Sequence, residues 1–77
     1  MWEVIGYECR KSEDGVVLSY TIHCVRPYAD GAGFGQRTCS EWFNAERVHY
    51  VPKVGDRILI DKEQRGKFLM ITDIIVM

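Results

Sequence analysis

Cysteine and histidine have the widest chemical range in this chain, and their spacing limits what they can do. Cys9, Cys24 and Cys39 lie fifteen residues apart, and the histidines are His23 and His49. Zinc sites usually draw on close ligand pairs such as C-x₂-C or H-x₃-H, and the chain has neither. An odd number of cysteines cannot close a full set of intrachain disulfides. We therefore predict three free thiols that pack as small apolar groups, and no metal site.

No catalytic pattern surrounds His23. A histidine that acts as a general base needs a nucleophile or a carboxylate beside it, and the sequence places neither next to His23. Gly31, Gly33 and Gly35 are closely spaced, but no Lys-Ser/Thr pair follows them to open a helix, as a phosphate-binding loop requires. The sequence predicts a protein that is not an enzyme and that uses no cofactor.

Aromatic and basic side chains offer a different chemistry, which is the binding of single-stranded nucleic acid. Such binding combines rings that stack on bases with cations that hold phosphates. The candidates for stacking are Tyr20, Phe34, Trp42 and Tyr50, and the candidates for phosphate contacts are Arg10, Lys11, Arg26, Arg37, Arg65 and Lys67. The net charge of −1 argues against a generally basic surface. The alternative roles are core packing for Tyr20, core packing or a dimer contact for Trp42, and solvated surface for the cations.

Three runs in the first part of the chain have the pattern of β-strands. They are Trp2–Lys11, Val16–Arg26 and Arg37–Asn44. Gly6 lies inside the first run, where glycine often marks a bulge that bends a strand. The second run alternates between an apolar face and a mostly polar face, which indicates one buried and one exposed side. The residues of its apolar face are Val16, Leu18, Tyr20, Ile22 and Cys24.

The segments between these runs are less regular. Pro27–Gln36 carries three glycines and no periodicity, so we expect a loop with Phe34 near its tip. Ala45–Tyr50 fits either one helical turn or a short strand.

The last third of the chain reads as a β-hairpin. Val54-Gly55-Asp56 predicts a turn, and a strand begins at Arg57. Lys62–Gly66 predicts a polar hairpin loop of four or five residues. Lys67–Met77 is apolar on both faces, so we expect a central strand. This places Leu69 and Ile71 in the core.

Length and composition fit one small domain that spans residues 1–77. The chain is 47% hydrophobic and 12% aromatic, which excludes a disordered chain. No apolar run approaches the roughly 18–20 residues that span a bilayer, and no secretory segment follows Met1. We therefore expect a cytoplasmic protein without a membrane partner. Five strands with little helix predict an all-β, partly open barrel, OB-like (oligonucleotide-binding) first and SH3-like second.

Several short motifs carry a resemblance to a known group of proteins. They are Val4–Glu8, the long second strand, Trp42-Phe43, Val54–Ile60 and Gly66-Lys67. In these the chain resembles small uncharacterised proteins of Gram-positive phages and conjugative elements, which are similar to the single-stranded DNA-binding proteins of filamentous phages. It departs from them at Glu63-Gln64-Arg65, where they often carry an aromatic residue and Asn. The resemblance implies an OB-like, non-catalytic module that binds single-stranded nucleic acid in a phage or mobile element.

Two functions follow as expectations. The first is binding of single-stranded DNA or RNA where loop Pro27–Gln36 approaches hairpin loop Lys62–Lys67. The second is a protein–protein interaction module, either a homodimer or an inhibitor or adaptor of a host protein, because small sheets with exposed aromatic residues often add strands.

Overall fold

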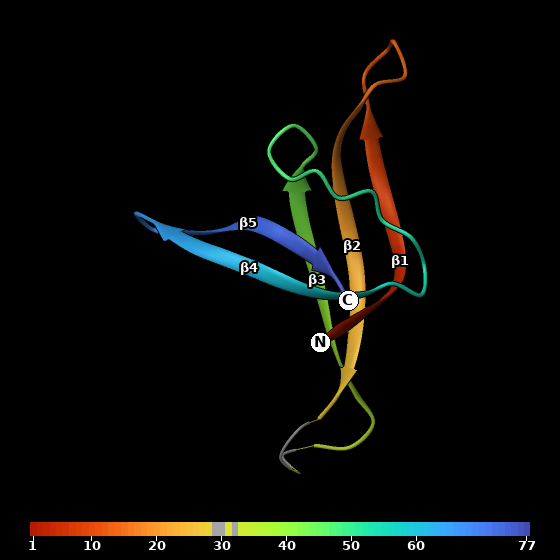
Figure 1. Cartoon of the computed structure of the whole chain (residues 1–77), viewed down its shortest axis with the longest axis vertical. Coiled ribbons are helices and arrows are strands. Elements are labelled where there is room, and N and C mark those ends of the chain that lie inside the picture. Colours follow the sequence, from red (N-terminus) through yellow and green to blue (C-terminus); the bar gives the residue numbers. More distant parts are fainter. Residues whose placement is uncertain (29–30, 32) are drawn as a thin grey trace.

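The computed structural model describes residues 1–28, 31 and 33–77, and in these residues all regular secondary structure is β. Five antiparallel strands form one sheet in the order β3-β2-β1-β4-β5. Their bounds are Trp2–Lys11 for β1, Val17–Pro27 for β2, Gln36–Asn44 for β3, Arg57–Arg65 for β4 and Phe68–Val76 for β5. Figure 1 shows the β4–β5 hairpin crossing one face of the β1-β2-β3 half. Since the described parts of β3 and β5 are not paired, the sheet is not closed, and the structure confirms an all-β, partly open, barrel-like fold of five strands.

A bulge in β1 lets this strand serve both halves of the sheet. Val4 pairs with Cys24, but the next partner of β2, His23, pairs with Gly6, so Ile5 is the extra residue. Beyond the bulge β1 follows β2, whereas its first residues, Trp2 and Glu3, also pair with β4. An extra residue bends a strand and increases its twist, which is what a strand shared between two layers needs. The bulge predicted at Gly6 is confirmed.

The turn before β4 is fastened to β1 at the same point. The amide of Gly55 donates to the carbonyl of Val4 over 2.8 Å, and the amide of Val4 donates to the carbonyl of Asp56 over 2.9 Å. Gly55 has a φ of 99°, a conformation that other residues rarely adopt. The predicted Val54-Gly55-Asp56 turn is therefore confirmed, and it fixes where the second hairpin starts.

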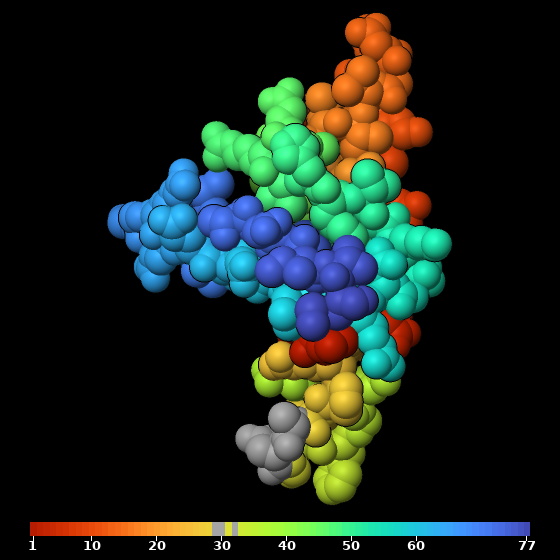
Figure 2. All heavy atoms as spheres, in the orientation of Figure 1, coloured from red at the N-terminus to blue at the C-terminus, as the bar shows by residue number. Residues whose placement is uncertain are grey.

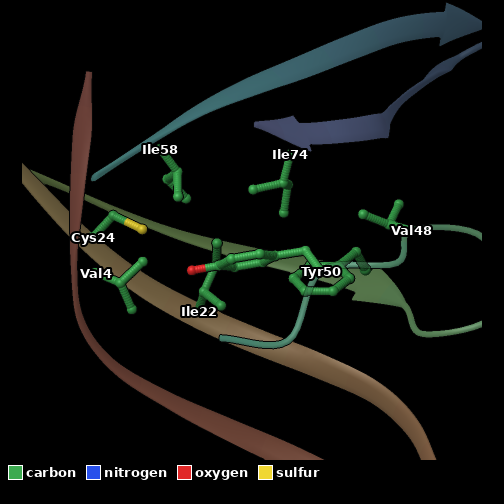
Figure 3. Close-up of a cluster of buried hydrophobic side chains, with 8 residues drawn as sticks. Val4, Ile22, Cys24, Val48, Tyr50, Ile58 and Ile74 are labelled. Atoms are coloured by element: carbon green, nitrogen blue, oxygen red, sulfur yellow. The ribbon is translucent and has the colours of Figure 1, made fainter. Parts of the chain in front are cut away.

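The core lies between the two halves (Figure 3). Val4 and Ile22 from the first half face Ile58 and Ile74 from the hairpin. Val4, Ile22 and Ile58 are fully buried, as is Cys24 beside them. Phe43 from β3 completes the layer. The inward face predicted for Ile22 and Cys24 is confirmed. It is wrong for Val16 and Leu18 at the other end of the strand, which are exposed, whereas Ser19 and Val25 from the predicted polar face are buried.

One helical turn follows β3 and closes one end of the core. The amide of Val48 donates to the carbonyl of Asn44 over 3.0 Å, and the Asn44 side chain accepts a bond from the amide of Glu46 over 2.8 Å. A side-chain cap of this kind satisfies a free amide at the start of a turn. Val48 and Tyr50 are buried as a result. Of the two readings of Ala45–Tyr50, the helical turn is the one observed.

The β4–β5 hairpin corrects three predictions. β4 runs to Arg65, and the connection is the two-residue turn Gly66-Lys67 rather than a loop of four or five residues. Gly66 supplies the positive φ that the first central position of such a turn requires. β5 is the last strand in the sheet order, so it lies at the edge and is not central. Its apolar face opposite the core is exposed.

Leu69 is correspondingly wrong as a core residue, since 63% of it is exposed. Ile71 is half-buried and packs against the core. A bulge at Thr72 changes which residues of β5 face the core. Asp61 pairs with Asp73 while Lys62 pairs with Ile71, so the faces of β5 change phase between Ile74 and Ile71.

This arrangement predicts that two apolar truncations on neighbouring strands differ strongly in their effect on stability. Ile58→Ala should lower the free energy of unfolding by about 2–5 kcal/mol, because it empties a fully buried site. Leu69→Ala should change it by less than about 0.5 kcal/mol, because the side chain is mostly exposed. Urea unfolding measures both values. A loss of stability in Leu69→Ala as large as that in Ile58→Ala would contradict the edge position of β5.

Candidate nucleic-acid interface

The open seam between β3 and β5 forms a groove of about 510 Å³. The end of β3 and the following turn form one wall, and the first half of β5 forms the other. Figure 2 shows these segments side by side, with the green residues that end β3 next to the blue residues of β5. We call this hollow the seam groove. Its lining residues are Glu41, Trp42, Phe43, Asn44, Arg47, Val48, Phe68, Leu69, Met70 and Ile71.

The β5 wall of the seam groove is apolar, because it consists of Phe68, Leu69, Met70 and Ile71. Because the strand changes phase at Thr72, Leu69 shares the inward side with the half-buried Ile71 instead of the outward side. In the described residues β3 is not paired with β5, and Leu69 stays exposed beside the opening. The floor of the groove is buried Phe43, which belongs to the core.

Two aromatic rings stand at the rim of the seam groove. Trp42 is 58% exposed on β3, and Phe68 is 74% exposed at the start of β5. Trp42 was among the residues predicted from the sequence to stack on bases. Phe68 was missed, because the apolar run that contains it predicts a buried strand. Its position directly after the Gly66-Lys67 turn was the available signal, since residues beside a hairpin tip are seldom covered.

Cations surround the same groove. Arg47 lines it, Arg65 is the strand partner of Phe68, and Lys67 occupies the turn between them. Glu63 lies 3.8 Å from Arg65, with both side chains about 60% exposed, so this pair is weak. Lys62 is bonded to Glu41 and thereby links β4 to β3 across the opening. Arg47 was missed by the sequence analysis, because its segment had no assigned structure.

The other predicted phosphate contacts lie elsewhere. Arg10 and Lys11 are exposed at the end of β1. Arg26 and Arg37 lie at the opposite end of the long sheet, next to the loop that follows β2. Figure 1 shows that loop at one end of the molecule and the β4–β5 tip at its side.

The structure therefore does not bring loop Pro27–Gln36 to hairpin residues Lys62–Lys67, as the sequence analysis expected. The reason is the crossing angle: β2 and β3 extend past the hairpin instead of ending beside it. Phe34 is 99% exposed, and no described residue of its loop lines the seam groove. Residues 29, 30 and 32 of the loop lie outside the described part of the chain.

Two predicted stacking residues belong to the interior. Tyr7, Tyr20, Phe43 and Tyr50 form a row of rings with centroids 6.2, 5.5 and 6.1 Å apart in succession. Tyr20 is half-buried in this row, so core packing is its observed role. Tyr50 is only 6% exposed, and its hydroxyl donates to Oδ2 of Asp56 over 2.8 Å. The prediction that Tyr50 stacks on a base is wrong for this reason.

His23 has neighbours that the sequence did not reveal. Its Nδ1 lies 2.8 Å from the hydroxyl of Ser40, and its Nε2 lies 3.3 Å from Oε1 of Glu8. The three side chains form a line across β1, β2 and β3 because a shared outward face brings together residues far apart in sequence. None of them lines the seam groove.

Two of the three thiols have the environment of packed groups. Cys24 and Cys39 are direct partners across β2 and β3, and both are free. Burial raises the pKa of the Cys24 thiol to about 12, and burial also raises the pKa of Cys39. Thiols of this kind stay protonated and react slowly. Cys9 is free as predicted, but it is exposed, so the prediction that all three thiols pack as small apolar groups is wrong for Cys9.

Comparison with protein-family models, curated proteins and solved structures finds no match to this chain. Within the described residues, no group of three or more histidine, cysteine or acidic side chains is placed to hold a metal ion. No helix in that part of the chain is long and apolar enough to cross a membrane.

The burial of Tyr50 predicts a loss of stability in alkali. Burial and the bond to Asp56 raise the pKa of Tyr50 above its usual value near 10. Above about pH 10 the unfolded chain loses this proton while the folded chain keeps it, so the free energy of unfolding should fall as pH rises. In Tyr50→Phe this part of the pH dependence should be absent. Urea unfolding at pH values on both sides of 10 measures it, and equal alkaline slopes in both proteins would contradict the assignment.

Proposed function

We propose that this protein is a non-catalytic module that binds single-stranded nucleic acid along the seam groove. The observation that supports this most directly is the presence of two exposed rings, Trp42 and Phe68, in one groove with Arg47. Rings beside cations are what a sequence-tolerant single-strand site needs. The resemblance to proteins of phages and conjugative elements favours the same function and a role in such an element.

The rings account for contacts to bases. Stacking of a base on an exposed aromatic side chain contributes about 1–3 kcal/mol and accepts any base, because every base has a flat face. Trp42 and Phe68 belong to different strands, so their separation is fixed by the sheet and not by a loop. An unstacked strand lying in the groove would therefore meet two fixed rings.

The cations account for contacts to phosphates. Arg47 on one wall and Arg65 and Lys67 at the hairpin tip flank the rings on both sides. Each phosphate of a single strand that a protein cation neutralises contributes about 0.7 to the steepness with which log affinity falls with log salt concentration. OB barrels bind oligonucleotides on the face of strands 2 and 3 and with loops that include the one between strands 4 and 5. The walls of the seam groove are β3 and the part of β5 that directly follows the β4–β5 turn.

A pair of phenylalanine variants tests the position of the interface. Phe68→Ala should weaken binding of a fluorescently labelled thymidine oligonucleotide by about 5- to 100-fold, the equivalent of one lost stacking contact. Phe34→Ala is the matched control, because this ring is even more exposed but lies away from the groove. Fluorescence anisotropy measures both affinities. If Phe34→Ala weakens binding and Phe68→Ala does not, the strand binds at the loop after β2 and the seam groove is excluded.

A pair of lysine variants tests the phosphate contacts. Lys67→Ala should lower the salt slope of binding by about 0.7, and Arg65→Ala with Lys67→Ala should lower it by about 1.4. Lys53→Ala is the control, since Lys53 is also an exposed lysine in a turn but lies outside the groove. Titrations at several salt concentrations give the slopes. Equal slopes in Lys67→Ala and Lys53→Ala would remove the hairpin tip from the interface.

A second candidate function rests on a separate observation. β3 and β5 are the outer strands of the sheet, and both border the seam groove with an unpaired edge in the described residues. Such edges accept an added strand from a partner. The partner would be a second copy of the chain or a host protein. Wild-type protein that binds no oligonucleotide at low salt, and that elutes as a dimer in gel filtration, would favour this function over the first.

A further inference from the structure

A second hollow, of about 330 Å³, lies at the other end of the sheet and shares no residue with the seam groove. It forms where the start of β1, the end of β2 and the start of β4 meet. Two arginines, Arg26 and Arg57, line it together with the aromatic ring of Trp2. Its remaining lining residues are Met1, Glu3, Val25, Pro27 and Gln36.

Arg26 is held in a defined orientation. The carbon of its guanidinium group lies 4.3 Å from the centroid of the Trp2 ring. Trp2 itself packs against the core, so the surface on which the guanidinium lies is fixed by the fold. A guanidinium stacked by its face keeps the N–H groups at its edge free to donate, and little side-chain freedom remains to be lost when an anion binds.

A third arginine adjoins this pair. Arg37 on β3 is the direct strand partner of Arg26 on β2, and its guanidinium carbon lies 5.9 Å from the centroid of the Tyr28 ring. Like charges directly opposite each other in a sheet repel and destabilise the pair of strands. Glu3 is the only acid among the residues that line the hollow, and its strand partner is Arg57. Positive charge therefore exceeds negative charge at this end of the sheet.

We infer that Arg26 and Arg57, with Trp2, form a binding site for a phosphate group in this hollow, and that Arg37, the strand partner of Arg26, adds positive charge beside it. The planar fork of an arginine matches two oxygens of a phosphate, and a bound anion offsets the repulsion between Arg26 and Arg37. The amide side chain of Gln36 at the same hollow adds a neutral donor. The phosphate belongs either to a nucleotide or to the backbone of a nucleic acid. This inference does not rest on the function proposed for the seam groove.

The fluorescence of Trp2 tests the site directly. The chain has two tryptophans, so Trp42→Phe leaves Trp2 as the only one. In this background we expect sodium phosphate and thymidine monophosphate to change the emission of Trp2 until the site is saturated. Sodium chloride at equal ionic strength, and thymidine, should leave the emission unchanged. A response to phosphate that only follows ionic strength, as with chloride, would overturn the inference.

Variants then identify the groups that bind. Arg26→Gln and Arg26→Lys should each weaken phosphate binding at least about tenfold, because the lysine retains the charge but loses the paired donors. Lys53→Gln is the control for the loss of a positive charge that does not line the hollow, and it should bind as the parent does. Circular dichroism shows whether Arg26→Gln is folded. If it is not, Arg57→Gln decides, since it leaves the stack on Trp2 intact, and unchanged phosphate binding in that variant would overturn the inference.

A thymidine oligonucleotide with a 5′-hydroxyl end separates the two sources of phosphate. Saturation of the Trp2 signal at a lower concentration than with thymidine monophosphate assigns the site to the backbone of a nucleic acid. A response to thymidine monophosphate without one to the oligonucleotide assigns it to a nucleotide. Either result leaves the seam groove to be judged by its own variants, Phe68→Ala and Lys67→Ala.

Discussion

The position of Val4 determines the rest of this structure. Its side chain is fully buried at the centre of the core, it is the strand partner of Cys24, and both of its backbone groups bond to the turn that begins the second hairpin. Only two residues of β1 pair with β4, so these two backbone bonds are a large part of what joins the halves. The bulge that follows at Ile5 lets β1 leave the hairpin and continue along β2. Both hollows arise because the two halves are joined at one point and diverge from it.

Stability and binding are consequently assigned to different parts of the chain. The core is confined to the crossing, where Ile22 meets Ile58 and Ile74, and a chain this short has little apolar surface to spare beyond it. The seam groove and the second hollow, which is lined by Arg26, Arg57 and Trp2, lie on either side of the crossing. Trp42, Phe68 and Arg57 can change without emptying a buried site. Phe43 and Val48 belong both to the core and to the lining of the seam groove, and Trp2 packs against the core.

Local patterns predicted much of this fold, and long-range geometry accounts for the differences. Gly6 marked the bulge in β1, and the alternation of β2 placed Ile22 and Cys24 correctly, because both signals act within one strand. The bulge at Thr72 contains no glycine that would predict it, and it places Leu69 and Ile71 on the same side of β5 as Ile74. The burial of Tyr50 depends on a bond to Asp56, and the approach of Arg26 to Trp2 depends on the β1–β2 register. No short segment of the sequence predicts the pairing of distant residues or the crossing angle of the hairpin.

The edge position of β5 has a consequence for the behaviour of the protein at high concentration. Phe68-Leu69-Met70-Ile71 is a run of apolar residues on an outer strand, without proline or charge to interrupt it. Exposed edges of this composition pair with one another and are the usual starting points of aggregation. Natural sheets protect such edges with charged side chains or with a covering segment. Here the nearest charges are Lys67 before the run and Asp73 after it. Whatever occupies the groove beside this edge would also act as its solubilising cover, so the free protein should be the form most prone to precipitate.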